Sequence, residues 1–148
     1  MQTLLKRYKR LLNNVSLDFV REIMNEIDWD ERLIAIRGAR GVGKTTLMLQ
    51  YLKMHYNEYG DKAIYVSLDS AYFTQKTIYD FVEEFYIGGG KLIMFDEVHK
   101  YEHWSRAMKN IYDEYPNMKI VFSGSSLIQI LNAEADLSRR CVAYDMQG

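Results

Sequence analysis

The sequence has little cysteine, little proline and no long apolar run. Its 148 residues include one cysteine and one proline, and the lone Cys141 excludes an internal disulfide and a zinc site built from several thiolates. The apolar runs are too short to cross a bilayer. The opening stretch MQTLLKRYKRLL has charges between its apolar residues and no signal-peptide cleavage site. We therefore expect a cytoplasmic protein of one domain, without a membrane partner.

An excess of charge of one sign is also missing. The chain carries 19 basic and 20 acidic residues, for a formal net charge of −1. This balance argues against a protein devoted to coating nucleic acid or binding a membrane surface, because both of those partners select basic chains. A local basic patch, and with it a DNA partner, stays open.

The chain does contain a regular alternation of elements. Residues 1–30 predict an N-terminal segment of two helices packed on the core, the second capped by Ser16 or Asp18. The apolar residues that this second helix would turn inward are Phe19, Val20, Ile23 and Ile27. Short apolar runs follow at 33–38, 63–69, 91–97, 119–125 and 141–146. Amphipathic stretches separate them near 44–58, 75–86, 103–115 and 126–132. This alternation predicts an α/β fold, with a five-stranded parallel sheet covered by helices on both faces.

A glycine-rich stretch between the first apolar run and the helix after it fits the phosphate-loop pattern G-x-x-x-x-G-K-[ST]. Side chains at its glycines would obstruct backbone amides that wrap a phosphate chain, and the following helix adds its positive N-terminal end. Lys44 can reach the β- and γ-phosphates, and the Thr45 hydroxyl can ligate Mg²⁺. The residues expected to bind nucleotide are Gly38, Ala39, Arg40, Gly41, Val42, Gly43, Lys44, Thr45 and Thr46. The alternative is a glycine-rich turn without a ligand. The full pattern would occur by chance in about 1 chain of this length in 200, which favours the phosphate loop.

An acidic pair ends the third apolar run, KLIMFDEVHKY. Asp96 can hold the Mg²⁺ shell, because the ion prefers oxygen ligands. Glu97 can orient or deprotonate an attacking water. The alternative for both is a helix cap. No N-K-x-D base-reading motif occurs, so ATP is favoured over GTP, and His99 is interpreted as a neighbour of the site or an interface residue.

Two further segments offer weaker candidates. After the fourth apolar run, Ser125 or Ser126 can sense the γ-phosphate, although Ser126 can equally cap the next helix. Before the fifth run, Arg139 and Arg140 lie at the amino end of their strand, whereas nucleotides sit outside carboxyl ends. These arginines are therefore expected to serve a neighbouring subunit as a catalytic finger, or else to form a surface pair or a salt bridge to Asp136.

These segments together resemble an AAA-type P-loop ATPase, and more narrowly the prokaryotic ATP-binding proteins related to the archaeal-ATPase and STAND-like groups. The matching segments are IRGARGVGKTTL (Walker A), YVSLD, LIMFDEVHKYEHW (Walker B), IVFSGSS and DLSRR. The resemblance implies a P-loop NTPase three-layer αβα sandwich over residues 31–148, with strands in the order 5-1-4-3-2. It also implies that Arg140 occupies the family's arginine position. Relatives usually continue into a C-terminal effector domain, so a sequence that stops at DMQG is expected to be either a fragment, truncated after the core, or an isolated ATPase core.

The expected function is Mg²⁺-dependent hydrolysis of ATP to ADP and phosphate. Lys44 and the loop amides would hold the phosphates, Thr45 and Asp96 the metal, and Glu97 the water. Turnover should be slow in a lone domain, because the arginine would come from a second copy in a homo-oligomer. The alternative is an ATP-dependent switch or loader with little turnover, acting on a protein or DNA partner.

Overall fold

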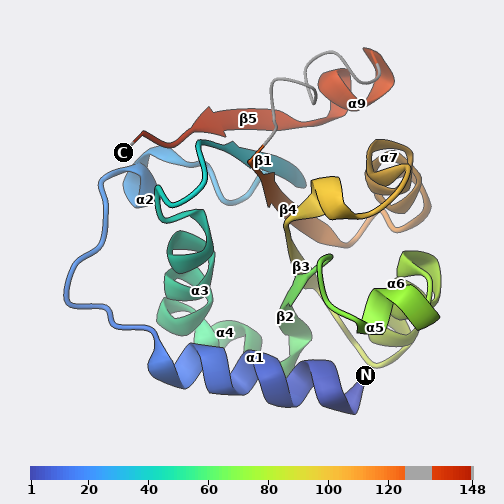
Figure 1. The fold of residues 1–148 in the computed structure, drawn as a ribbon, viewed down its shortest axis with the longest axis horizontal. Helices are drawn as coiled ribbons and strands as arrows, with labels where there is room; N and C mark the ends of the chain where they lie inside the picture. Colours follow the sequence, from blue (N-terminus) through green and yellow to red (C-terminus); the bar gives the residue numbers. More distant parts are fainter. Residues whose placement is uncertain (126–134, 148) are drawn as a thin grey trace.

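The computed structural model describes residues 1–125 and 135–147, which form a central sheet with helices on either side (Figure 1). The sheet contains β1 (Leu33–Arg37), β2 (Ala63–Ser67), β3 (Leu92–Asp96), β4 (Lys119–Gly124) and β5 (Val142–Asp145). The strands lie in the order β2-β3-β4-β1-β5, and every neighbouring pair is parallel. The predicted fold class and the strand order 5-1-4-3-2 are therefore confirmed.

The helices form the two outer layers (Figure 1). One layer holds α1 (Gln2–Asn14), α2 (Ile23–Glu26), α3 (Lys44–Met54) and α4 (Tyr56–Tyr59), and the other α5 (Tyr72–Gln75), α6 (Ile78–Ile87) and α7 (Trp104–Glu114). The last helix, α9 (Ala135–Arg140), leads into β5. Short 3₁₀ turns occur at Gly60–Lys62 and Val98–Lys100. No helix in the described part of the chain has the length and apolarity to cross a membrane.

The core lies between the sheet and these layers. The residues of β3 are all buried, as are the first four of β1 and of β2, which explains their continuous apolar runs. In α1 the buried residues Leu4, Tyr8 and Leu12 recur at every fourth position, so one stripe of the helix packs on α3 and β2. The N-terminal segment thus covers the helix that follows the glycine loop.

The second predicted helix is largely wrong. Only the four residues of α2 are helical, and Phe19, expected to point inward, is 76% exposed. The cause lies in α3, where the buried Gln50 amide donates to the carbonyl oxygens of Ser16 (2.9 Å) and Phe19 (2.8 Å). Lys53 likewise donates to the carbonyl of Val15. Because α3 side chains take these carbonyls, the segment between α1 and α2 stays irregular.

Other predicted boundaries differ by smaller amounts. The expected helix 44–58 is divided at His55 into α3 and α4. The expected helix 75–86 begins at Ile78, where Thr77 accepts a hydrogen bond from the Asp80 amide as an N-cap. Helix α9 was not predicted, and the predicted helix 126–132 lies outside the described residues.

Candidate active site

The glycine loop joins the carboxyl end of β1 to the first residue of α3. Gly41 and Gly43 adopt left-handed backbone conformations, with φ of 86° and 102°, which side chains disfavour. Gly38 is required for a different reason, since a Cβ there would lie 2.6 Å from the carbonyl oxygen of Met146. The segment after β5 therefore packs directly on the loop, which the sequence pattern did not indicate.

Lys44 opens α3 and points back into the loop. Its Nζ donates to the carbonyl oxygens of Gly38 (2.7 Å) and Ala39 (2.8 Å), and the residue is buried. Burial lowers the pKa of Lys44, while the carboxylates of Asp96 and Glu97 act in the opposite direction. The ammonium is thus held by loop carbonyls, which an arriving anion can replace as partners.

Thr45 and Asp96, the two predicted metal ligands, are in direct contact. The Thr45 hydroxyl donates to Oδ2 of Asp96 at 2.5 Å, although the residues are 51 positions apart in the sequence. A hydroxyl and a carboxylate are suitable ligands for Mg²⁺, which accepts oxygen donors and keeps several waters. Within residues 1–125 and 135–147 no group of three or more His, Cys, Asp or Glu is placed around a metal position. A cation here would therefore complete its shell with phosphate oxygens and water.

Asp96 has two further hydroxyl partners that sequence reasoning missed. Tyr65 in β2 donates to its Oδ2 at 2.5 Å, and Ser123 in β4 donates to its Oδ1 at 2.6 Å. The backbone amide of Glu97 also donates to Oδ1, at 3.0 Å. Burial, followed by the Asp96 charge and hydrogen bond, raises the pKa of Tyr65, so its phenol keeps the proton that it donates. The Asp96 carboxylate is buried yet bonded at both oxygens.

The strand register explains these partners. Phe95 pairs with Phe122, so the next residues, Asp96 at the end of β3 and Ser123 in β4, lie side by side. That pairing could have been found from the apolar runs once the strand order was assumed. Tyr65 pairs with Met94 instead and reaches Asp96 across a diagonal, which no motif in the sequence signals.

Glu97 has surroundings unlike those of Asp96. It adopts a left-handed conformation with φ of 55°, and its side chain is 35% exposed. Its Oε2 lies 3.4 Å from Nε2 of His99, whose other ring nitrogen, Nδ1, is buried with no hydrogen-bond partner among the described residues. A non-glycine residue in this conformation is strained, as often found at functional positions.

Ser125 and Arg140 are the remaining predicted site residues. Ser125 follows β4 directly and is half-buried, whereas Ser126 lies outside the described residues. Arg140 ends α9 at the amino end of β5, whereas the glycine loop follows the carboxyl end of β1, the parallel neighbour of β5. Arg140 pairs with Asp113 of α7 at 2.8 Å. That bond lowers the pKa of Asp113. Arg140 therefore faces away from the loop of its own chain, as its sequence position predicted.

The N-terminal segment and the end of β5 brace the glycine loop. Arg21 donates to the carbonyl oxygen of Val42 at 3.1 Å and also to that of Gln147. Arg37, the last residue of β1, forms a two-point ion pair with Asp145 of β5 at 2.7 and 2.9 Å. The loop is thus held in place by contacts from the N-terminal segment and from the residues after β5, in addition to its own turns.

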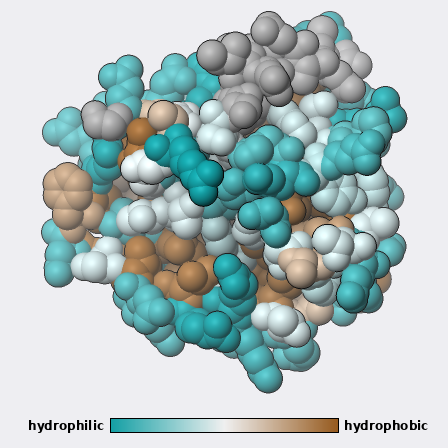
Figure 2. Space-filling view, viewed as in Figure 1, coloured by the Kyte–Doolittle hydropathy of each residue, from teal (hydrophilic) through white to brown (hydrophobic). Residues whose placement is uncertain are grey.

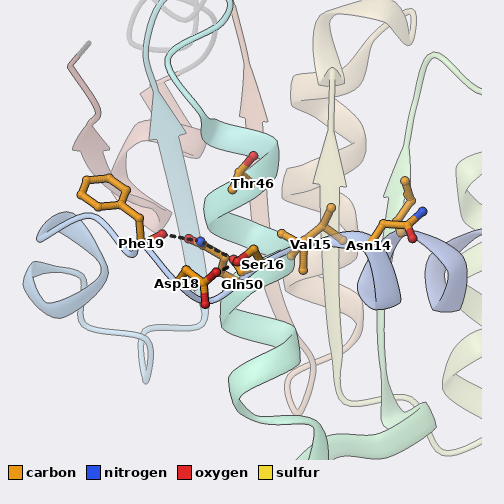
Figure 3. Close-up of a pocket in the computed structure, with 9 residues that line it drawn as sticks. Asn14, Val15, Ser16, Asp18, Phe19, Thr46 and Gln50 are labelled. Carbon is orange, nitrogen blue, oxygen red and sulfur yellow. Dashed lines mark hydrogen bonds between the residues drawn. The ribbon is translucent and has the colours of Figure 1, made fainter.

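A hollow of about 500 Å³ lies beside the first turns of α3. Figure 3 shows Thr46 at one end of it and the segment from Asn14 to Phe19 crossing below, with Gln50 bonded to that segment. Figure 2 shows hydrophobic surface gathered over α3 near the end of α1. Thr46 is therefore exposed on the outer side of α3, next to the loop but away from Asp96 in β3.

Comparisons with known proteins agree with this geometry. A family model described as an AAA domain matches residues 30–148. An uncharacterized protein of Methanocaldococcus jannaschii is 30% identical over an alignment of 153 positions. The match covers 94% of this chain and 31% of that protein. Among solved structures, PCH-2 of C. elegans has a TM-score of 0.53 at 17% identity, covering 99% of this chain and 41% of its own. The Pif1 helicase of Candida albicans has a TM-score of 0.55 at 8% identity, covering 89% and 40%. The chain thus spans about a third of the curated relative, and these structures share its fold.

Proposed function

Because the chain belongs to the AAA domain family, we propose that it binds ATP with Mg²⁺ where β1 meets α3, and hydrolyses it to ADP and phosphate. The observation that carries this proposal is the contact between Thr45 and Asp96, 2.5 Å apart beside the glycine loop. Two oxygen ligands for a hard cation meet at the point where a loop and a helix N-terminus offer backbone amides to an anion.

In this proposal the loop amides and Lys44 hold the β- and γ-phosphates. Lys44 exchanges its present bonds to the carbonyls of Gly38 and Ala39 for phosphate oxygens, which carry full charge and bind an ammonium more strongly. Helix α3 begins without a side-chain cap, so its first amides are available to the anion. Thr45 and Asp96 hold the cation, which when bound neutralises charge on the phosphates.

Glu97 is the residue proposed to orient and deprotonate the attacking water. It follows Asp96 directly, and its partly exposed carboxylate can turn toward a water beside the terminal phosphate. Arg140 is proposed to act on the site of a second copy, since it lies at the amino ends of the strands and its own loop at their carboxyl ends. Ser125, at the end of β4, is proposed to sense the γ-phosphate.

The contact between Glu97 and His99 favours a second candidate function. A carboxylate held 3.4 Å from an imidazole is not committed to a water, so the domain can bind ATP and turn it over very slowly. In that case it would act as an ATP-dependent switch or loader, and its output would be altered contact with a protein or DNA partner.

The test measures binding and turnover separately. Calorimetry with Mg·ATP should show uptake by the parent chain and none by Lys44→Ala. Phosphate release should fall by about 100-fold or more in Glu97→Gln, with and without added DNA, if Glu97 is a general base. A parent chain no faster than Glu97→Gln would refute the enzyme and leave the switch. Sizing with a non-hydrolysable ATP analogue tests the oligomer, since a monomer throughout contradicts an arginine supplied by a neighbour.

A further inference from the structure

Tyr65 opens the segment YVSLD and lies in neither Walker motif, yet its phenol reaches the carboxylate proposed to hold the cation. Its Oη donates to Oδ2 of Asp96 at 2.5 Å, and both residues are buried, at 7% and 2% exposure. We propose that Tyr65 is a positioning residue that holds the Asp96 carboxylate in the orientation that binds Mg²⁺. This inference rests on the proposed function, and it assigns a specific task to β2.

The position of Tyr65 requires a long side chain. Tyr65 pairs with Met94, two residues before Asp96 on β3, so the side chains of Tyr65 and Asp96 project from the same face of the sheet. The diagonal between such positions spans about 7–8 Å, a distance that aromatic side chains can bridge. A serine or threonine at position 65 would be too short to reach the carboxylate.

The two donors to Oδ2 of Asp96 are expected to behave differently when a cation binds. Thr45 and Tyr65 both donate to this oxygen, each at 2.5 Å. Thr45 is itself a proposed ligand, so its hydroxyl must turn from the carboxylate toward the ion. Tyr65 is not a proposed ligand and can keep its bond, so it is the donor that holds Oδ2 through the exchange.

The other carboxylate oxygen is already held. Oδ1 accepts from Ser123 at 2.6 Å and from the Glu97 amide at 3.0 Å. With Tyr65 on Oδ2, the carboxylate stays hydrogen-bonded at both oxygens after Thr45 leaves, and the acceptor position that Thr45 gave up becomes available to a cation. Partners of this kind, one step removed from the metal, change its affinity by about 10–100-fold when they are mutated.

The experiment compares ATP binding with and without the metal. ATP is titrated calorimetrically into the parent chain and into Tyr65→Phe, first in EDTA and then in MgCl₂. The gain in affinity on adding Mg²⁺ should fall about tenfold in Tyr65→Phe, because the ring stays but the hydroxyl that orients Asp96 is gone. Affinity in EDTA should be unchanged, because the loop and Lys44 are untouched.

The chain offers a matched control in Tyr115→Phe. Tyr115 donates to Oε2 of Glu83 at 2.5 Å and is also buried, but this bond joins the end of α7 to α6 in the opposite layer. Its removal deletes the same kind of phenol–carboxylate bond and should leave both affinities unchanged. Thermal melts of each variant check that the fold is retained.

Several outcomes would overturn the inference. A Tyr65→Phe chain with the parent's full gain from Mg²⁺ would reduce Tyr65 to a packing residue. An equal loss in EDTA and in MgCl₂, or the same loss in Tyr115→Phe, would indicate a general effect on the fold. If the parent binds ATP in neither buffer, the proposed function fails and the inference fails with it. If the parent gains from Mg²⁺ and Tyr65→Phe gains equally, only the inference fails.

Discussion

Asp96 and Glu97 are adjacent in the chain and both are acidic, yet their surroundings are opposite. Asp96 is buried in regular strand conformation and accepts four hydrogen bonds from four different residues. Glu97 is partly exposed, left-handed in backbone and close to one histidine. At the end of β3, Asp96 is therefore held in place by its donors, which makes it the rigid side of the site. Glu97, with fewer contacts, is the adjustable side. This contrast suits the proposed roles, in which the metal ligand Asp96 is held fixed and Glu97, proposed to handle water, can move.

The largest effect that this contrast predicts is on stability. Asp96→Asn replaces an acceptor with an amide whose NH₂ group would face hydroxyl donors. We expect the free energy of unfolding to fall by about 3 kcal/mol, because buried donors lose their partner. Urea unfolding would measure the change, and Glu97→Gln is the matched control, expected to lose no more than about 1 kcal/mol. Equal losses in the two variants would contradict the contrast.

A smaller loss is expected from Ser123→Ala, which removes one hydroxyl donor from the buried carboxylate. The free energy of unfolding should fall by about 1.5 kcal/mol, the lower range for a hydrogen bond to a charged group. Ser67→Ala, at the end of β2, supplies a control in which the serine is only half-buried and its hydroxyl accepts from the Asp69 amide. If Ser123→Ala is no less stable than Ser67→Ala, the hydroxyl that Ser123 donates to Asp96 does not contribute to holding that carboxylate.

On the adjustable side, His99→Ala tests whether the imidazole restrains Glu97. Contacts between exposed charged groups contribute at most about 1 kcal/mol, so removing this one should raise phosphate release by up to about fivefold. The Glu97→Gln/His99→Ala double variant is the control, because without the carboxylate the second change should have no effect. A decrease in turnover for His99→Ala would show instead that His99 supports Glu97.

The sheet was predictable because its signals are local and continuous. Strands β1 to β4 are apolar runs that are mostly buried, whereas the edge strand β5 is only partly covered. Gly41 and Gly43 stand where the backbone turns left-handed. The strand order followed from the resemblance rather than from any residue pattern, and the structure confirms it. Thr45 and Asp96, 51 residues apart, are brought together by that order.

What the sequence could not supply are contacts between distant residues that carry no periodic signal. The segment after α1 has helical spacing, but Gln50, 34 residues beyond Ser16, takes the carbonyls that a helix would need. Tyr65 reads as one more core aromatic, and only the diagonal across β2 and β3 reveals its bond to Asp96. In both cases one polar side chain, fixed by tertiary packing, determines the outcome.

The smallest expected effect concerns the backbone of Glu97. Replacing an ordinary residue by glycine lowers the free energy of unfolding by about 0.5–1 kcal/mol through entropy. At φ of 55° glycine also relieves a left-handed strain of about 1–2 kcal/mol, which equals or exceeds that loss, so Glu97→Gly should not be destabilised. Lys100→Gly, at the end of the 3₁₀ turn that follows Glu97, should lose the whole 0.5–1 kcal/mol, roughly, because Lys100 has no left-handed strain to relieve. Urea unfolding of both variants tests this prediction. If Glu97→Gly is destabilised as much as Lys100→Gly, the backbone of Glu97 is not strained in the parent chain.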